Sequence, residues 1–312
     1  MPFINRIEMR LLKLLIPCLA ILAACNNHQT EGKRKAVLDT VSLSSKKFEL
    51  AYQNDGKITA TSLDTLYQVS FGGATDAAIS PDGNQLAYTV SDSSNNRSIW
   101  MVNMETKSQD QLDVKSKNFY QAMFSPDGKN IAFSIFKNGI WKIGVIGSDN
   151  KNYTLIDGAS KLSYYSPTWK GNTELVMQDM DNLYVFGLDG KLRNKFVLRD
   201  LVGKDLNFAN SDRFFYTSDE KSIIFNASNA ADKLDGLMEP GESIYKLDLA
   251  SKAISKISPK GYSAPFIFLT PKDMLVFSAL EKPFKVPKIY RSDIKGSDFK
   301  LLVDKGSNPS AN

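Results

Sequence analysis

Few side chains in this sequence are arranged for catalysis or for metal binding. His28 is the only histidine among 312 residues. A histidine-based metal site would need a second histidine, and a Ser-His-Asp triad would need its histidine on a folded scaffold, whereas His28 lies in the polar segment 26–35. It also has no G-x-S-x-G elbow, and no glycine loop of the phosphate-binding type. We therefore expect a protein that is not an enzyme and needs no cofactor, although a lysine, tyrosine or carboxylate mechanism stays open.

Two kinds of acidic motif could bind a cation or transfer a proton. Asp179 and Asp181 alternate in the stretch 179–182, as oxygen ligands do at the start of a calcium loop, but the glycine and the later glutamate of an EF-hand are missing. Asp82 and Asp127 each follow a Ser-Pro pair and precede a glycine. Proline presets the second position of a turn and glycine accepts a positive φ, so these motifs favour turns over catalytic carboxylates.

The N-terminal residues 1–24 have the layout of a secretory signal. Arg6, Arg10 and Lys13 precede an apolar run at 14–24, which is about half of the ~20 residues that a membrane-spanning helix needs. Residues 22–25, Leu-Ala-Ala-Cys, resemble the lipobox of bacterial lipoproteins. An ordinary signal peptide with a chance cysteine is the alternative.

The lipobox resemblance implies cleavage before Cys25 and lipidation of that cysteine. Residues 25–35 would then be a polar tether, and the protein would sit in the cell envelope, anchored to the outer membrane and facing the periplasm. Cleavage would remove Cys18 and leave Cys25 as the one remaining cysteine, so we expect no intramolecular disulfide.

The charge of the chain excludes one class of partner. Lysine and arginine number 39 against 34 aspartates and glutamates, a net charge of +5. This excess is small and evenly scattered, so we expect no nucleic-acid binding.

The body of the sequence contains a repeat. Ser-Pro-Asp-Gly at 80–83 is followed by the apolar triplet 86–88, and the same order returns 45 residues later at 125–128 and 131–133. Further apolar triplets begin at Leu50, Leu175, Ile223 and Leu275. An aliphatic residue, in five of six copies followed by an aromatic one, then marks a second element, as in Ile99-Trp100 and Ile140-Trp141.

These repeats predict an all-β fold, a six-bladed β-propeller of four-stranded antiparallel blades. Continuous apolar triplets are typical of strands buried on both faces, and a blade can bury both faces only between two neighbours in a ring. We expect the propeller to span 36–305, with 36–43 as an innermost or closing strand and 306–312 as a disordered tail.

The repeat S-P-D-G-x-x-[IL]-A-[FY], followed by an I-[YW] strand, resembles the propeller repeat of the periplasmic Tol-system protein TolB and the WD-like repeats of envelope lipoproteins. The motif is complete in the copies at 80–88 and 125–133 and departs from the pattern in the last three copies. The resemblance covers 36–305 and does not include the N-terminal domain of TolB. It implies a propeller in the cell envelope.

The loops between the second and third strands of the blades vary most in length, and we expect all six on one face. Such variation is typical of a surface that meets a partner. The candidate partner-binding residues are Asp92, Arg97, Phe136, Lys137, Asp179, Asp181, Leu237, Met238, Phe284 and Lys285.

We therefore expect a non-catalytic, monomeric scaffold that binds another envelope protein or peptide. The alternative is a propeller that binds a carbohydrate or small molecule in its central channel, with weak hydrolase or lyase activity included.

Overall fold

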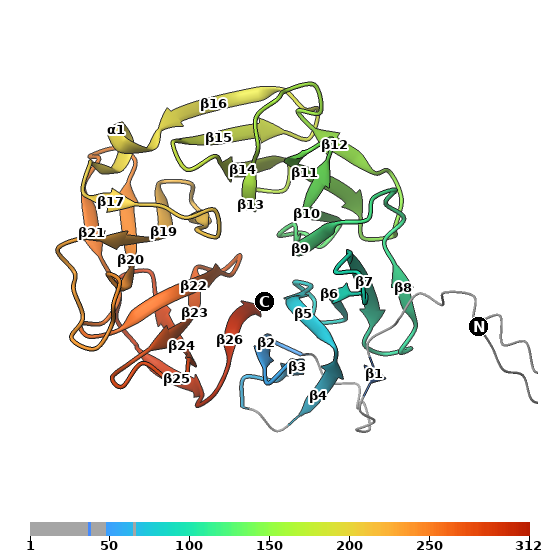
Figure 1. The fold of residues 1–312 in the computed structure, drawn as a ribbon, viewed down its shortest axis with the longest axis horizontal. Helices are drawn as coiled ribbons and strands as arrows, with labels where there is room; N and C mark the ends of the chain where they lie inside the picture. The colour runs from blue at the N-terminus through green and yellow to red at the C-terminus, as the bar shows by residue number, and fades with distance from the viewer. Residues whose placement is uncertain (1–36, 39–47, 65–66) are drawn as a thin grey trace, which may run out of the picture. The chain divides into compact units, whose positions relative to one another are not determined.

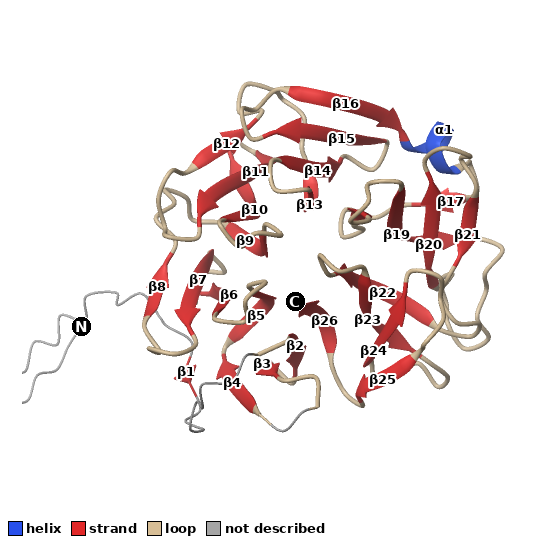
Figure 2. Cartoon of the chain, turned by 180° about the vertical axis from the view of Figure 1, so that it is seen from behind, coloured by secondary structure: helices blue, strands red, loops and turns tan. Residues whose placement is uncertain are grey.

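The strands of this chain form six sheets that surround a common axis (Figure 1). The computed structural model describes residues 37–38, 48–64 and 67–312, which belong to the unit Arg34–Asn312. The signal segment, Cys25 and the tether at 25–35 lie outside the described residues. One short helix, α1 (Leu198–Val202), occurs among the described residues and lies at the outer rim of the ring (Figure 2). The prediction of an all-β, six-bladed propeller is confirmed.

Each blade has four antiparallel strands that follow one another from the axis outward. Blade 1 contains β26 (Ser307–Ala311), β2 (Leu50–Asn54), β3 (Lys57–Thr61) and β4 (Gln68–Gly72), with β1 (Val37–Leu38) outside β4. Blade 2 contains β5 (Ala74–Ile79), β6 (Gln85–Ser91), β7 (Arg97–Asn103) and β8 (Gln109–Gln111). Blade 3 contains β9 (Phe119–Phe124), β10 (Asn130–Lys137), β11 (Ile140–Gly147) and β12 (Thr154–Ile156).

The second half of the ring follows the same plan. Blade 4 contains β13 (Tyr165–Lys170), β14 (Glu174–Gln178), β15 (Asn182–Gly187) and β16 (Leu192–Val197). Blade 5 contains β18 (Phe214–Tyr216), β19 (Ser222–Asn229), β20 (Glu242–Asp248) and β21 (Ile254–Lys256), and β17 (Leu206–Asn207) also pairs with β19. Blade 6 contains β22 (Ser263–Leu269), β23 (Met274–Leu280), β24 (Lys288–Asp293) and β25 (Lys300–Val303).

The apolar triplets of the sequence are the second strands of the six blades. In β6, for example, Leu86, Ala87 and Tyr88 are all completely buried. Successive residues of a strand point to opposite faces, so a run buried without alternation must be covered on both sides. The neighbouring blades bury the two faces, and the uninterrupted apolar triplets in the sequence indicate this packing.

The Ser-Pro-Asp-Gly motifs form the turns between first and second strands. The Ser80 hydroxyl donates to Asp82 Oδ1 (2.6 Å) and accepts from the Gln85 amide (2.9 Å), and Gly83 has a φ of 73°. Blade 5 keeps the same arrangement without the motif, because Thr217 donates to Asp219 Oδ1 (2.7 Å) and Glu220 takes the left-handed position with a φ of 56°. The turns of blades 2 and 5 thus share a hydroxyl that donates to the aspartate two residues later.

The ring is closed by β26, which lies at its centre and pairs with β2 (Figure 1). The prediction of a disordered tail at 306–312 is therefore wrong. Ser307–Ala311 lacks an apolar run, but its register places Ala311 opposite Leu50 and Ser310 opposite Ala51 in the closing sheet. Ser310 Oγ also accepts from the Ile79 amide of blade 2 at 3.1 Å, so β26 joins two blades.

The expectation that 36–43 forms an innermost or closing strand is also wrong. Val37 and Leu38, its described residues, pair with Gly72 and Phe71 of β4 at the outer edge of blade 1. Blade 1 nevertheless combines strands from both ends of the chain, because β26 belongs to the same sheet as β2.

The meander gives the ring two different faces. The four strands of a blade alternate in direction, and each fourth strand ends on the face from which the next first strand begins, so all first strands run in the same direction along the axis. The second-to-third loops therefore open together on one face, which we name the loop face. The first-to-second turns, such as 80–83 and 125–128, lie together on the opposite turn face.

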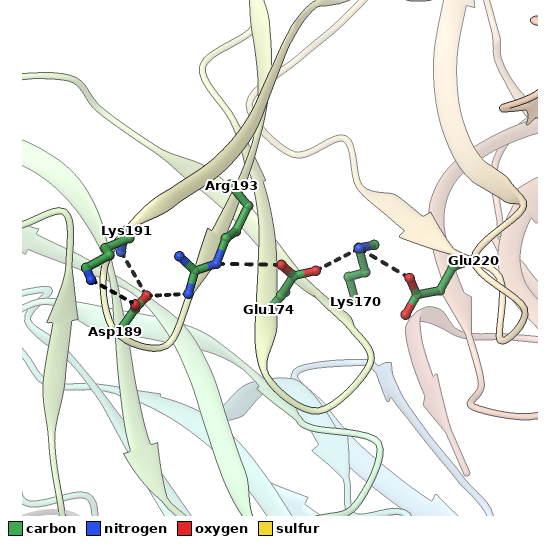
Figure 3. A network of polar contacts seen from close by, with 6 residues as sticks. All are labelled: Lys170, Glu174, Asp189, Lys191, Arg193 and Glu220. Atoms are coloured by element: carbon green, nitrogen blue, oxygen red, sulfur yellow. Dashed lines mark hydrogen bonds and ion pairs between the residues drawn. The ribbon is translucent and has the colours of Figure 1, made fainter.

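A chain of ion pairs joins blades 4 and 5 on the turn face (Figure 3). Lys170 Nζ contacts Glu174 at 2.7 Å and Glu220 at 3.2 Å, and Arg193 links Glu174 to Asp189. Partial burial opposes the charge of Lys170, but the hydrogen bonds that it donates to Glu174 and Glu220 outweigh this effect and raise its pKa. Networks of this kind fix neighbouring elements more effectively than isolated surface pairs.

Closure by β26 makes Ser310 a sensitive position. Ser310→Ala removes the acceptor of the buried Ile79 amide, and a buried donor without a partner costs about 1–3 kcal/mol. We expect the free energy of unfolding, measured by urea titration, to fall by that amount. Ser94→Ala, at an exposed loop position, is the control and should change it by less than about 0.5 kcal/mol. Equal values for the two variants would contradict the closing role of β26.

Candidate interaction face

The loop face carries two long loops on adjacent blades that contact each other. Residues 230–241 connect β19 to β20, and residues 281–287 connect β23 to β24. Lys282 Nζ lies 2.6 Å from Asp235 Oδ2, and the Phe284 ring lies beside Gly236, where a Cβ would be 3.6 Å from it. We name these two segments the blade 5–6 loop pair.

The blade 5–6 loop pair exposes apolar side chains. Met238 is fully exposed, Val286 is 44% exposed, and Leu237 and Phe284 are partly exposed. Lys285 is exposed beside them. Four of the residues predicted from the sequence, Leu237, Met238, Phe284 and Lys285, thus belong to one contiguous pair of loops.

Arg97 and Phe136 meet in a second cluster between blades 2 and 3. The Arg97 guanidinium lies 3.6 Å above the Tyr120 ring centroid and donates through Nε to Asn118 Oδ1 (2.8 Å). The Phe136 ring packs 5.0 Å from Trp141, which in turn lies 5.2 Å from Tyr120. Such cation–π contact holds Arg97 in place. Phe136 remains 40% exposed, and Lys137 is exposed next to it.

The predicted acidic residues have mainly local roles. Asp92 Oδ1 accepts from the amides of Ser94 (2.8 Å) and Asn96 (2.9 Å). Asp179 accepts from the Asn182 amide (2.6 Å) and the Tyr184 hydroxyl (2.7 Å). Both carboxylates shape their own loops, while Asp181 is exposed.

Sequence reasoning missed four polar residues in the innermost strands of the ring, which we name the polar belt. Asp76, Gln121, Ser166 and Asn308 all have a φ between 47° and 58°, and each lies in a first strand where the register with the second strand shifts. A bulge of this kind redirects a side chain and is common near functional sites. The signal was present in part, because Asp76 and Gln121 both lie four residues before a Ser-Pro-Asp-Gly motif.

The belt links blades that are distant in the sequence. Asn308 Nδ2 of blade 1 donates to Asp76 Oδ1 of blade 2 at 3.0 Å. Burial raises the pKa of Asp76, although Arg213 of blade 5 acts against this shift. The charge of Arg213 thus influences a carboxyl group in the blade on the other side of the ring.

Blade 5 also holds a pair of carboxyl groups that share one amide. Asn226 Nδ2 donates to Asp212 Oδ1 and to Glu242 Oε2, each at 2.7 Å. Burial and then the nearby Glu242 charge raise the pKa of Asp212 to about 8, and burial raises the pKa of Glu242 as well. Two close carboxyl groups that cannot both ionise share a proton.

Within the part of the chain that the structure describes, no group of three or more His, Cys, Asp and Glu side chains could hold a metal ion. None of the helices found there is long and apolar enough to cross a membrane.

Comparison with known proteins identifies the fold. No protein-family model matches the chain, and no curated protein matches it. Putative TolB from Agrobacterium tumefaciens is similar, with a TM-score of 0.59 and 16% identity over 86% of this chain and 94% of that chain. This chain has the propeller fold of TolB.

Two further structures show the same TolB-like propeller. TolB from Acinetobacter baumannii has a TM-score of 0.60 and 13% identity, over 84% of this chain and 66% of that chain. The β-propeller domain of the Trilobed protease from Pyrococcus furiosus has a TM-score of 0.51 and 17% identity, over 83% of each chain. That domain is described as having an open velcro topology, whereas in this chain β26 closes the ring.

The Asp212–Glu242 pair predicts a pH dependence of stability. The folded protein keeps a proton on Asp212 up to about pH 8, whereas an unfolded aspartate loses it near pH 4. Unfolding between these limits releases the proton, so stability should decrease as pH rises from about 5 to 8. The thermal midpoint measured across this range should show that slope.

Asp212→Asn should make this slope shallower, because the carboxamide cannot ionise. Asp248→Asn, in an exposed turn where hydrogen bonds from Ser251 lower the pKa of Asp248, should leave the slope between pH 5 and 8 unchanged. An Asp212→Asn variant with the slope of the parent protein would disprove the shared proton.

Proposed function

We propose that this protein is a non-catalytic, monomeric propeller scaffold that binds another envelope protein or an exposed peptide through its loop face. A lipid on Cys25 would anchor it to the outer membrane, with the propeller in the periplasm. The observation that carries the proposal is the exposed apolar surface of the blade 5–6 loop pair, centred on Met238.

The composition of this loop pair suits protein recognition. Methionine and aromatic side chains are enriched at interfaces, and methionine adapts its shape to a partner. Met238, Leu237 and Phe284 provide the apolar centre, while Lys285 and the Lys282–Asp235 pair provide a polar rim. The contact between the two loops holds this surface together before a partner binds, which lowers the cost of ordering it.

The TolB-like fold supports the same proposal. The resemblance of the repeat to that of a periplasmic Tol-system protein agrees with an envelope location and with a role in protein binding. Peptidase propellers share the fold too, so the case against catalysis rests on this chain's own residues. On the loop face, the carboxylates of Asp92 and Asp179 accept hydrogen bonds from backbone amides of their own loops, which leaves them poorly placed as general acids or bases.

Loss of the apolar centre should abolish partner binding without unfolding the protein. The double variant Met238→Ser, Phe284→Ser removes two anchors, and a central interface anchor is worth about 2 kcal/mol or more. We expect at least ~30-fold weaker capture of the partner after crosslinking in native envelopes. Because both side chains are wholly or partly exposed, the thermal midpoint should stay close to that of the parent protein.

Leu192→Ser is the matched control, because Leu192 is 49% exposed on the outermost strand of blade 4. It should leave partner capture unchanged. The proposal fails if the double variant captures the partner as well as the parent does, or if no protein is captured by either.

Membrane attachment has a separate test. Cys25→Ala removes the thiol that a lipid would modify, so the variant should lose incorporation of labelled fatty acid. It should also appear as soluble protein or as uncleaved precursor after cell fractionation. Continued labelling and membrane association of the variant would exclude Cys25 as the lipid site.

A further inference from the structure

On the turn face, the centre of the ring holds a cavity of about 190 Å³. All six blades contribute to its wall, at the ends of the first strands and at the turns that follow them. The residues that define its character are Pro81, Pro126, Trp169, Phe215, Phe268 and Pro271. This cavity lies on the face opposite the blade 5–6 loop pair.

The wall of the cavity is apolar and rigid. Trp169 is 6% exposed and its Nε1 donates to the Met123 carbonyl at 3.0 Å, so the indole is fixed. The rings of Phe215 and Phe268 pack 5.8 Å apart. Pro81 and Pro126 belong to the two Ser-Pro-Asp-Gly turns, so residues that shape the turns also line the cavity.

The size of the cavity points to a single ring. An apolar cavity of about 150 Å³ accommodates benzene, whereas sites for whole drug-sized ligands measure roughly 300–1,000 Å³. A volume of about 190 Å³ fits one aromatic side chain. Aromatic walls favour an aromatic occupant through edge and offset contacts.

Several charges in the turns beside the cavity already have local partners. Lys170 is paired with Glu220 at 3.2 Å and Lys129 with Asp127 at 3.7 Å. The Asp219 carboxylate is held by Thr217 at 2.7 Å. Because these charges already have local partners, they offer little to select a charged ligand.

The rim also offers a polar side chain to a polypeptide. Asn172 lines the cavity and is exposed at the turn of blade 4, whereas Ser218, at the turn of blade 5, already donates its amide (2.8 Å) and its hydroxyl (2.7 Å) to Asp273. A carboxamide can donate to and accept from a peptide backbone. We propose that this cavity binds an uncharged aromatic side chain, of phenylalanine or tryptophan, presented by a polypeptide. The peptide backbone lies along the rim, while the aromatic ring of the side chain enters the cavity.

Photolabelling of the full-length protein tests this proposal. The probe is the peptide acetyl-Gly-X-Gly-amide, where X is a phenylalanine that carries a trifluoromethyl diazirine on its ring. We expect mass spectrometry to map adducts to Met123, Trp169 and Tyr216, which line the cavity. Acetyl-Gly-Phe-Gly-amide should compete for this labelling, and acetyl-Gly-Ala-Gly-amide should not.

Two variants and one further competitor make the test decisive. Ala311→Leu fills the cavity from its wall, and Asn172→Trp, at an exposed rim position that does not depend on core packing, obstructs its mouth. Each folded variant should lose labelling of the cavity at least tenfold. The Met238→Ser, Phe284→Ser variant should keep it, which separates this site from the loop face.

Unchanged labelling in the folded Asn172→Trp variant would overturn the proposal, as would adducts that map elsewhere. Competition by free indole as strong as that by the phenylalanine peptide would show that the ring alone is recognised, and would overturn the polypeptide source.

Discussion

Pairing of β26 with β2 is the constraint on which the rest of the structure depends. A blade buries both faces only between two neighbours, so an open ring would leave a face of blade 1 and a face of blade 6 exposed. The pairing brings Ser310 next to Ala51, which is over 250 residues away in the chain. It also places Asn308 beside Asp76 of the next blade. Closure therefore completes the hydrophobic core and also brings polar residues of different blades together at the axis.

The closed ring explains why the loop face and the turn face differ chemically near the axis. Every first strand starts near the loop face, where four of them bulge at the residues of the polar belt, Asp76, Gln121, Ser166 and Asn308. Each then ends at the turn face in apolar residues such as Phe124 and Trp169. A polar belt and an apolar mouth thus arise from the two ends of the same strands, and the exposed loop pair of blades 5 and 6 lies apart from both.

The sequence predicts those features that depend on neighbours in the chain. The apolar triplets, the Ser-Pro-Asp-Gly turns and the grouping of Leu237 with Met238 are local, and the structure confirms where they lie. The role of Ser307–Ala311 was not predictable, because a short strand without an apolar run acquires its place only from β2 and Ile79. The contact of Arg97 with Tyr120 and the cavity around Trp169 likewise join residues from different blades. Sequence periodicity carries no information on such contacts.

Native-state hydrogen exchange measures the closure most directly. If β26 is an integral strand of blade 1, its backbone amides should exchange only through global unfolding, with the same opening free energy as amides of β6 in the core. Exchange of the β26 amides within seconds, while those of β6 remain protected, would show that the ring opens in the folded protein and would contradict this account.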